Sequence, residues 1–253
     1  MLTSIRSLTA ATALAGAAFF ATPALAQDAE GLTGESGWSV SGNAAIVSDY
    51  RFRGVSLSGG DPAIQGGADI GHDSGFYVGS WGSSIDGGAY GSVELDLYGG
   101  WAGEVGPGVE LDVGVLYYMY PNGTPGVDLD YWEVYSSVGT TLGPVGATLG
   151  AAYAWDQDSL GGSDNLYIYT DFEVGIPTTP LTFTAHAGYT DGVLAPPLLT
   201  GLSADDSGFD WSLGVSATVM GSLSVGVQYI GTEGPSVDGF TDDALVATLS
   251  IAI

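Results

Sequence analysis

Stretches of about ten residues in which apolar and polar side chains alternate recur along the whole chain. In 109–119 the odd positions hold Val, Leu, Val, Val, Tyr and Met, and Glu110 and Asp112 lie between them. A period of two predicts strands with one apolar face and excludes a helix with a continuous apolar stripe. Twelve such segments are predicted, at 38–54, 62–72, 75–86, 92–101, 109–119, 131–142, 145–156, 166–176, 181–190, 209–219, 222–231 and 244–253.

Two all-β architectures fit this alternation: a soluble sandwich or barrel with its apolar faces inward, and a transmembrane barrel with them outward. The segments are long enough to cross a bilayer, which takes about 9–11 residues per strand. Longer and tighter connections alternate along the chain, and aromatic residues lie near the ends of apolar faces, at Trp38, Trp101, Trp132, Trp155, Tyr189 and Trp211. These features favour a single antiparallel up-and-down transmembrane β-barrel of about 12 strands, with both termini in the periplasm.

The N-terminus has the pattern of a secretory signal peptide. Arg6 precedes an apolar run rich in small residues, and Ala24–Leu25–Ala26 fits a cleavage site. The prediction is a cleaved signal peptide at 1–26, a short periplasmic segment at 27–36 and a barrel at 37–253; a retained N-terminal helix is the alternative. After residue 26 no run of 18 apolar residues predicts a transmembrane helix.

The chain is strongly acidic, with 29 Asp and Glu against 3 Arg, no Lys and no Cys. This balance excludes nucleic acid as a partner, because phosphate binding needs basic patches. Side-chain parity turns the following candidate pore-lining residues into the lumen: Asp49, Arg51, Arg53, Asp69, Glu94, Asp96, Glu110, Asp112, Glu133, Asp171, Glu173 and Asp210. The two arginines either neutralise part of this acidic cluster or form one wall of a constriction with a transverse field.

Other chemistry is sparse. His72 lies in a predicted turn, and His186 faces the lumen, where it could pair with an acid such as Asp171; we expect no enzyme activity. Residues 156–165 do not match a calcium loop, although Asp156, Asp158 and Asp164 are weak candidates for loosely bound Ca²⁺. No other cofactor is expected. The apolar stretch 193–202 is expected either to cover the barrel mouth as a lid or to contact a partner.

Residues 47–86 resemble the opening of the TorF-like porins, a family of Gram-negative outer-membrane proteins of poorly defined function. The motifs "SDYRFRG" at 48–54 and "DSGFYVG" at 73–79 carry this resemblance. It implies a barrel in the outer membrane with a pore-like role, and it supplies no catalytic residue. The C-terminal Ile253 departs from the terminal aromatic residue of many outer-membrane barrels, which bears on recognition by the barrel-assembly machinery.

Two functions remain open from the sequence. The first is a passive channel for small polar or cationic solutes, contacting outer-membrane lipid. The second is a non-conducting structural or adhesion barrel whose lumen is filled by side chains and by a long loop. Twelve strands lie between filled eight-stranded barrels and open sixteen-stranded porins, so strand number does not decide. Lumen tyrosines could fill the gap, at 98, 118, 131, 135, 167 and 169.

Overall fold

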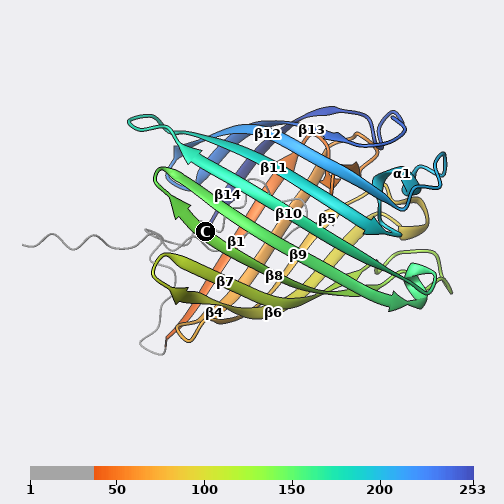
Figure 1. The fold of residues 1–253 in the computed structure, drawn as a ribbon, viewed down its shortest axis with the longest axis horizontal. Helices are drawn as coiled ribbons and strands as arrows, with labels where there is room; N and C mark the ends of the chain where they lie inside the picture. Colours follow the sequence, from red (N-terminus) through yellow and green to blue (C-terminus); the bar gives the residue numbers. More distant parts are fainter. Residues whose placement is uncertain (1–36) are drawn as a thin grey trace, which may run out of the picture.

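The computed structural model describes residues 37–253 and shows a closed antiparallel barrel of twelve strands (Figure 1). The predicted signal peptide at 1–26 and the segment at 27–36 lie outside the described residues. Successive wall strands pair with each other, and β1 closes the ring against β14. The wall consists of β1 (Trp38–Val47), β4 (Ala63–His72), β5 (Phe76–Ser84), β6 (Val93–Gly106), β7 (Val109–Met119), β8 (Tyr131–Leu142), β9 (Val145–Gln157), β10 (Ser163–Gly175), β11 (Leu181–Gly192), β12 (Ser207–Met220), β13 (Leu223–Thr232) and β14 (Ala244–Ala252).

The predicted all-β fold and the count of twelve strands are confirmed. Among the described residues, no helix is long and apolar enough to cross a membrane. The helical elements between residues 37 and 253 are two single 3-10 turns, Gly88–Tyr90 and Asp158–Leu160, and the four-residue α1 (Pro196–Leu199). Strand β6 runs to Gly106 and is therefore longer than the segment 92–101 that the alternation predicts.

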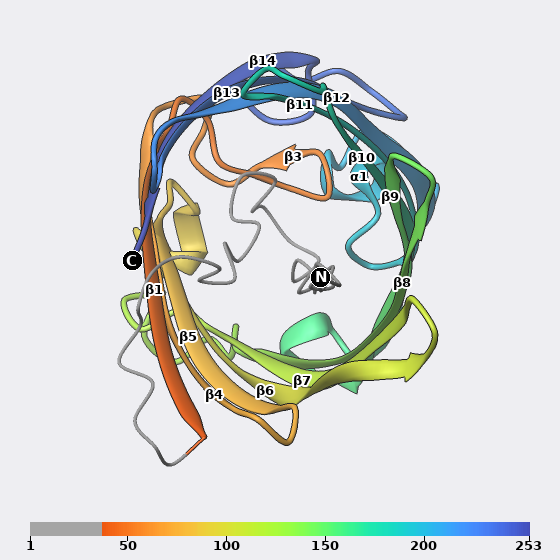
Figure 2. The same ribbon diagram turned by 90° about the vertical axis from the view of Figure 1, so that its left-hand side faces the viewer.

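The predicted first strand, 38–54, is wrong beyond Val47. The last pairs of β1 are Val47 with Thr248 of β14 and with Ala63 of β4, after which the chain leaves the wall. Residues 48–62 turn inward and form a hairpin of β2 (Arg51–Phe52) and β3 (Val55–Ser56). Figure 2, viewed along the barrel, shows β3 inside the ring of wall strands. We call residues 48–62 the inner hairpin.

The connections sort to the two ends of the barrel. Between the wall strands they alternate as 48–62, 73–75, 85–92, 107–108, 120–130, 143–144, 158–162, 176–180, 193–206, 221–222 and 233–243. We call the end with the inner hairpin the loop end and the opposite one the turn end. The predicted alternation of longer and shorter connections is found, although 158–162 is no longer than 176–180. Figure 1 shows the larger loops and α1 gathered at the loop end.

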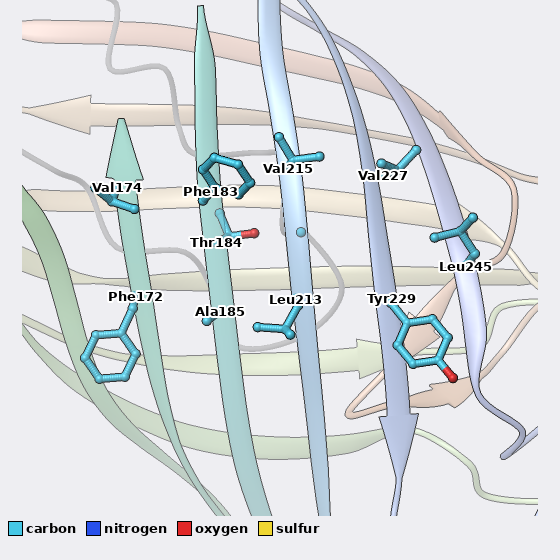
Figure 3. Close-up of a pocket in the computed structure, with 11 residues that line it drawn as sticks. Phe172, Val174, Phe183, Thr184, Ala185, Leu213, Val215, Val227, Tyr229 and Leu245 are labelled. Carbon is cyan, nitrogen blue, oxygen red and sulfur yellow. The ribbon is translucent and has the colours of Figure 1, made fainter. Parts of the chain in front are cut away.

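The outer face of the barrel is apolar. Outward side chains such as Ile64 and Leu213 are 70% and 59% exposed, although they are hydrophobic. A shallow apolar groove crosses β10 to β14 on this face, with Phe172, Phe183 and Leu213 among its lining residues (Figure 3). Aromatic side chains meet on the same face near the loop end, where Tyr117 stacks on Trp132 and Tyr189 contacts Phe209. An exposed apolar band with interfacial aromatic residues is typical of transmembrane barrels.

The lumen is packed by tyrosines that lie over glycines. A Cβ atom on Gly114 would overlap the side chain of Tyr135, its cross-strand partner, and one on Gly150 would overlap Tyr169. Glycine in the middle of a strand normally costs stability, and an aromatic ring over the bare backbone offsets part of that cost. The tyrosines expected in the gap do occupy it: five of the six are buried, and Tyr135 is half-buried.

Candidate functional site

The tip of the inner hairpin is a tight turn at Arg53 and Gly54, whose φ angles are 48° and 80°. Phe52 pairs with Val55 across this turn, so both central residues are left-handed, as a type I′ turn requires. Glycine adopts this conformation freely, but an arginine there is strained and is held by its surroundings. The turn therefore fixes Arg53 at the tip of the hairpin.

Arg53 reaches across the lumen to β8. Its Nη2 donates to both carboxylate oxygens of Glu133, at 2.8 and 2.9 Å, and both side chains are buried. The guanidinium carbon lies 4.4 Å from the ring centroid of Tyr167 and 4.6 Å from that of Phe52. Burial alone would lower the pKa of Arg53, but the charge of Glu133 outweighs it, and the pKa lies above its ordinary value.

Arg51 links the inner hairpin to Asp49, near the start of the hairpin, and to the loop at 233–243. Its Nε donates to Asp49 at 2.6 Å, and its Nη2 donates to Asp242 at 3.2 Å. Asp49 also accepts from the hydroxyls of Ser56 and Ser58, at 2.6 and 3.2 Å. Both arginines thus pair with acids, as the charge-neutralisation hypothesis predicts, but they do so from a hairpin inside the barrel and not from the wall.

Tyr50 attaches the hairpin to β6. Its hydroxyl donates to Glu94 at 2.6 Å, and Tyr120 donates to the other oxygen of Glu94 at 3.3 Å. In the predicted strand 38–54, Tyr50 and Phe52 share the parity of Trp38 and would face lipid. This prediction is wrong, because the hairpin turns both side chains into the barrel. Burial raises the pKa of Tyr50 well above its ordinary value, and the charge of Glu94 raises it further.

A second group of lumen residues links β10, β11 and β12. Asp171 Oδ1 lies 2.6 Å from Nδ1 of His186, so the expected pair forms. Nε2 of the same ring lies 2.8 Å from the hydroxyl of Tyr167 and 3.0 Å from Asp210 Oδ1. Because Tyr167 also stacks against Arg53, this group is continuous with the hairpin tip.

The wall of the middle lumen carries acid–tyrosine pairs. Tyr98 donates to Asp69 at 2.5 Å, and Tyr77 donates to Asp112 at 2.7 Å. Tyr77 also lies within hydrogen-bond distance of the Tyr135 hydroxyl. Among residues 37–253, Asp69 and Asp112 form no ion pair with a basic side chain. The tyrosine hydroxyls therefore satisfy these carboxylates, which lowers the cost of keeping them inside the barrel.

The predicted site residues are more deeply buried near the loop end of the barrel than near the turn end. Seven of them lie buried around the hairpin: Asp49, Arg51, Arg53, Glu94, Asp96, Glu133 and Asp210. Asp112 is buried farther along β7, whereas Asp69, Glu110 and Asp171 are half-buried and Glu173 is exposed. In the described part of the chain, the loop half of the lumen is therefore filled and the turn half is open to solvent.

The loop at 193–206 adds to the filling of the loop half. Val193 and Leu194 pack against a buried cluster that includes Tyr118 and Tyr131, and Pro196 and Pro197 of α1 are buried. Figure 2 shows α1 inside the outline of the barrel. This packing agrees with the lid hypothesis for 193–202, although Leu202 at its end is 70% exposed.

The calcium candidates do not form a cluster. Asp164 accepts a hydrogen bond from Tyr153 at 2.9 Å on the outside of the barrel. Between residues 37 and 253, no group of three or more His, Cys, Asp or Glu side chains is placed to hold a metal ion. Loose binding of Ca²⁺ by Asp156, Asp158 and Asp164 stays a prediction.

Sequence reasoning missed two contacts of the site that lie outside the strands, Asp242 with Arg51 and Tyr120 with Glu94. Asp242 and Tyr120 lie in connections, where side-chain parity carries no information. The local signal for the hairpin was Gly54 directly after Arg53, because a glycine in a short turn between two extended pairs indicates a hairpin. The alternation is interrupted at Val47 and Ser48 but resumes with Tyr50 and Phe52, which concealed this signal.

A closed twelve-stranded barrel with an apolar outside and a charged inside is the architecture of outer-membrane porins. The NanC porin superposes with a TM-score of 0.56 over 85% of this chain and 99% of its own, at 9% identity. A KdgM porin, solved in complex with disordered oligogalacturonate, superposes with a TM-score of 0.54 over 84% of this chain and 96% of its own, at 6% identity. At these identities the likeness concerns the fold alone.

Residues 31–250 match the family described as "Bacterial protein of unknown function (Gcw_chp)". The chain belongs to this family. No curated protein matches the sequence.

Proposed function

We propose that this protein is a channel of the Gram-negative outer membrane that lets small polar or cationic solutes diffuse across. The observation that carries the proposal is the opposition of the two faces of the barrel, apolar outside and lined with carboxylates inside. Such a wall needs lipid around it and attracts cations into it. The porin-like fold of the neighbours supports the same function.

The proposal also includes the orientation of the barrel in the membrane, its export and its assembly. Both termini lie in the periplasm, so that the shorter connections face the periplasm and the loop end faces outward. The protein is exported by its signal peptide and inserted by the barrel-assembly machinery. The motif "SDYRFRG" at 48–54 supports membership of the TorF-like porins. We assign the barrel no enzyme activity and no cofactor.

A non-conducting barrel is the second candidate, and a specific observation favours it. The inner hairpin and a buried cluster of tyrosines fill the loop half of the lumen. If that packing is permanent, the protein serves as a structural or adhesion barrel. If the hairpin moves, the same packing is the closed state of a channel.

Single-channel recording in planar bilayers separates the two candidates. The channel predicts discrete conductance steps from the purified protein. A matched variant in which residues 50–57 are replaced by a short Gly-Ser linker should conduct more, because the obstruction is gone. Steps in the shortened variant alone would identify a barrel that is plugged in its native form.

A further inference from the structure

The guanidinium of Arg53 occupies a site that the barrel wall builds around it. Glu133 of β8 supplies a carboxylate that accepts twice, and Tyr167 of β10 supplies an aromatic face. Tyr118 also donates to Glu133, at 2.9 Å, and so helps to hold the carboxylate in place. Paired oxygens and a flat ring are the two features that recognise a planar guanidinium.

Hydrogen-bonding groups of both Arg53 and the wall are left unpaired at this site. Within residues 37–253, Nε and Nη1 of Arg53 have no hydrogen-bond partner, although they are buried. Asp210 Oδ2, on the residue that bonds Tyr167, also has none. An unsatisfied buried polar group lowers stability, so the tethered arginine fits the site incompletely.

Vacating the site without a replacement cation is unfavourable. Glu133, Glu94 and Asp96 are all buried in this half of the lumen. The described chain has two arginines and no lysine, and both arginines lie on the inner hairpin. Withdrawal of the hairpin would therefore remove every arginine from a buried set of carboxylates, which is strongly unfavourable.

We infer that the wall site formed by Glu133, Tyr167 and Asp210 binds solutes that carry a guanidinium group, in exchange for the side chain of Arg53. The inner hairpin then acts as a tethered competitor: it fills the site when no solute is present and leaves it when a solute arrives. The inference rests on the proposed channel for the route by which a solute reaches the site. It narrows the proposed cationic solutes to one chemical class.

Arg53→Gly is the variant that exposes the site. Glycine accepts the φ of 48° at this position, so the turn is kept while the guanidinium is removed. The probe is methylguanidinium, and tetramethylammonium is the control because it has the same charge and no N–H donor. The measurements are the thermal unfolding midpoint in detergent and the dissociation constant by titration calorimetry.

Methylguanidinium at millimolar concentration should raise the midpoint of Arg53→Gly and bind it at least about tenfold more tightly than the wild type. Tetramethylammonium should do neither, and the double variant Arg53→Gly with Glu133→Gln should lose the effect. Equal responses of wild type and Arg53→Gly would overturn the inference, as would an effect that survives Glu133→Gln.

A folding assay covers the case in which Arg53→Gly does not fold alone. The folded fraction on heat-modifiable gels is then measured after refolding with each cation. Recovery with methylguanidinium but not with tetramethylammonium supports the site, and equal yields with both overturn it. None of these measurements uses conductance. If the protein conducts but Arg53→Gly does not bind methylguanidinium, the inference is refuted and the proposed channel function is not.

Discussion

Arg53 and Glu133 are 80 positions apart in the chain, yet the arginine Nη2 lies 2.8 and 2.9 Å from the two oxygens of the carboxylate. The pair joins the tip of the inner hairpin to the wall strand β8. It is buried on both sides, so neither charge can be compensated by water.

Glu133→Gln should lower the free energy of unfolding by about 3–5 kcal/mol, because it leaves the buried guanidinium without its counter-charge. Urea titration of the protein in detergent measures the change. Glu173→Gln is the matched control, since that carboxylate is exposed near the turn end. In the double variant Arg53→Gln with Glu133→Gln, the loss should be smaller than the sum of the single losses. Additive losses would show that the pair is not coupled.

Gly150→Ala should cost about 1–3 kcal/mol of stability, because the added methyl overlaps the ring of Tyr169 and forces it to move. Gly175→Ala is the control: its Cβ would meet no atom within 4 Å. The midpoint of heat-modifiable unfolding on gels gives the ranking. If both variants are equally stable, the tyrosine does not rest on the glycine.

Stability should fall as the pH rises above about 10. Burial and the charge of Glu94 raise the pKa of both Tyr50 and Tyr120 well above 10.0 in the folded protein. The unfolded chain releases these protons near pH 10 and the folded chain does not, so the stabilisation is complete below that pH and is lost above it. Unfolding midpoints between pH 8 and 12 test this. Tyr50→Phe should flatten the alkaline slope; an unchanged slope would place the effect elsewhere.

Leu213→Arg tests whether the outer face meets lipid. The side chain is 59% exposed in mid-strand, so in a water-soluble barrel the charge would cost almost nothing. In a bilayer it should cost about 2–4 kcal/mol, whereas Met220→Arg at the end of β12 should cost about 0–1 kcal/mol. Unfolding in lipid vesicles measures both. Equally small costs would argue against a membrane-spanning wall.

The wall of the barrel could be predicted from sequence because alternation fixes which side chains share a face. Glu94, Glu133 and Asp210 were assigned to the lumen in this way, and all three are buried inside the barrel. The inner hairpin could not be predicted because Tyr50 and Phe52 continue the period of the first strand. Period alone does not distinguish a strand that pairs in the wall from a hairpin that folds behind it.

The side-chain contacts of the site could not be predicted from local sequence patterns either. Arg53 meets Glu133 and Tyr167 only once the barrel closes and the turn at Gly54 points the guanidinium at β8. Two contacts depend on how the loops fold over the mouth: Asp242 accepts from Arg51, and Tyr120 donates to Glu94. The sequence predicted that the arginines lie among lumen acids, but not which acids they pair with.

The reversal potential of the purified protein in a planar bilayer, under a gradient of KCl, tests the central claim most directly. The lumen carries many carboxylates, and its two arginines are already paired with acids. Its potential should therefore be negative, so that cations are concentrated and anions are excluded. We predict a reversal potential of the sign that K⁺ preference gives; Cl⁻ preference, or the absence of any conductance, would contradict the claim.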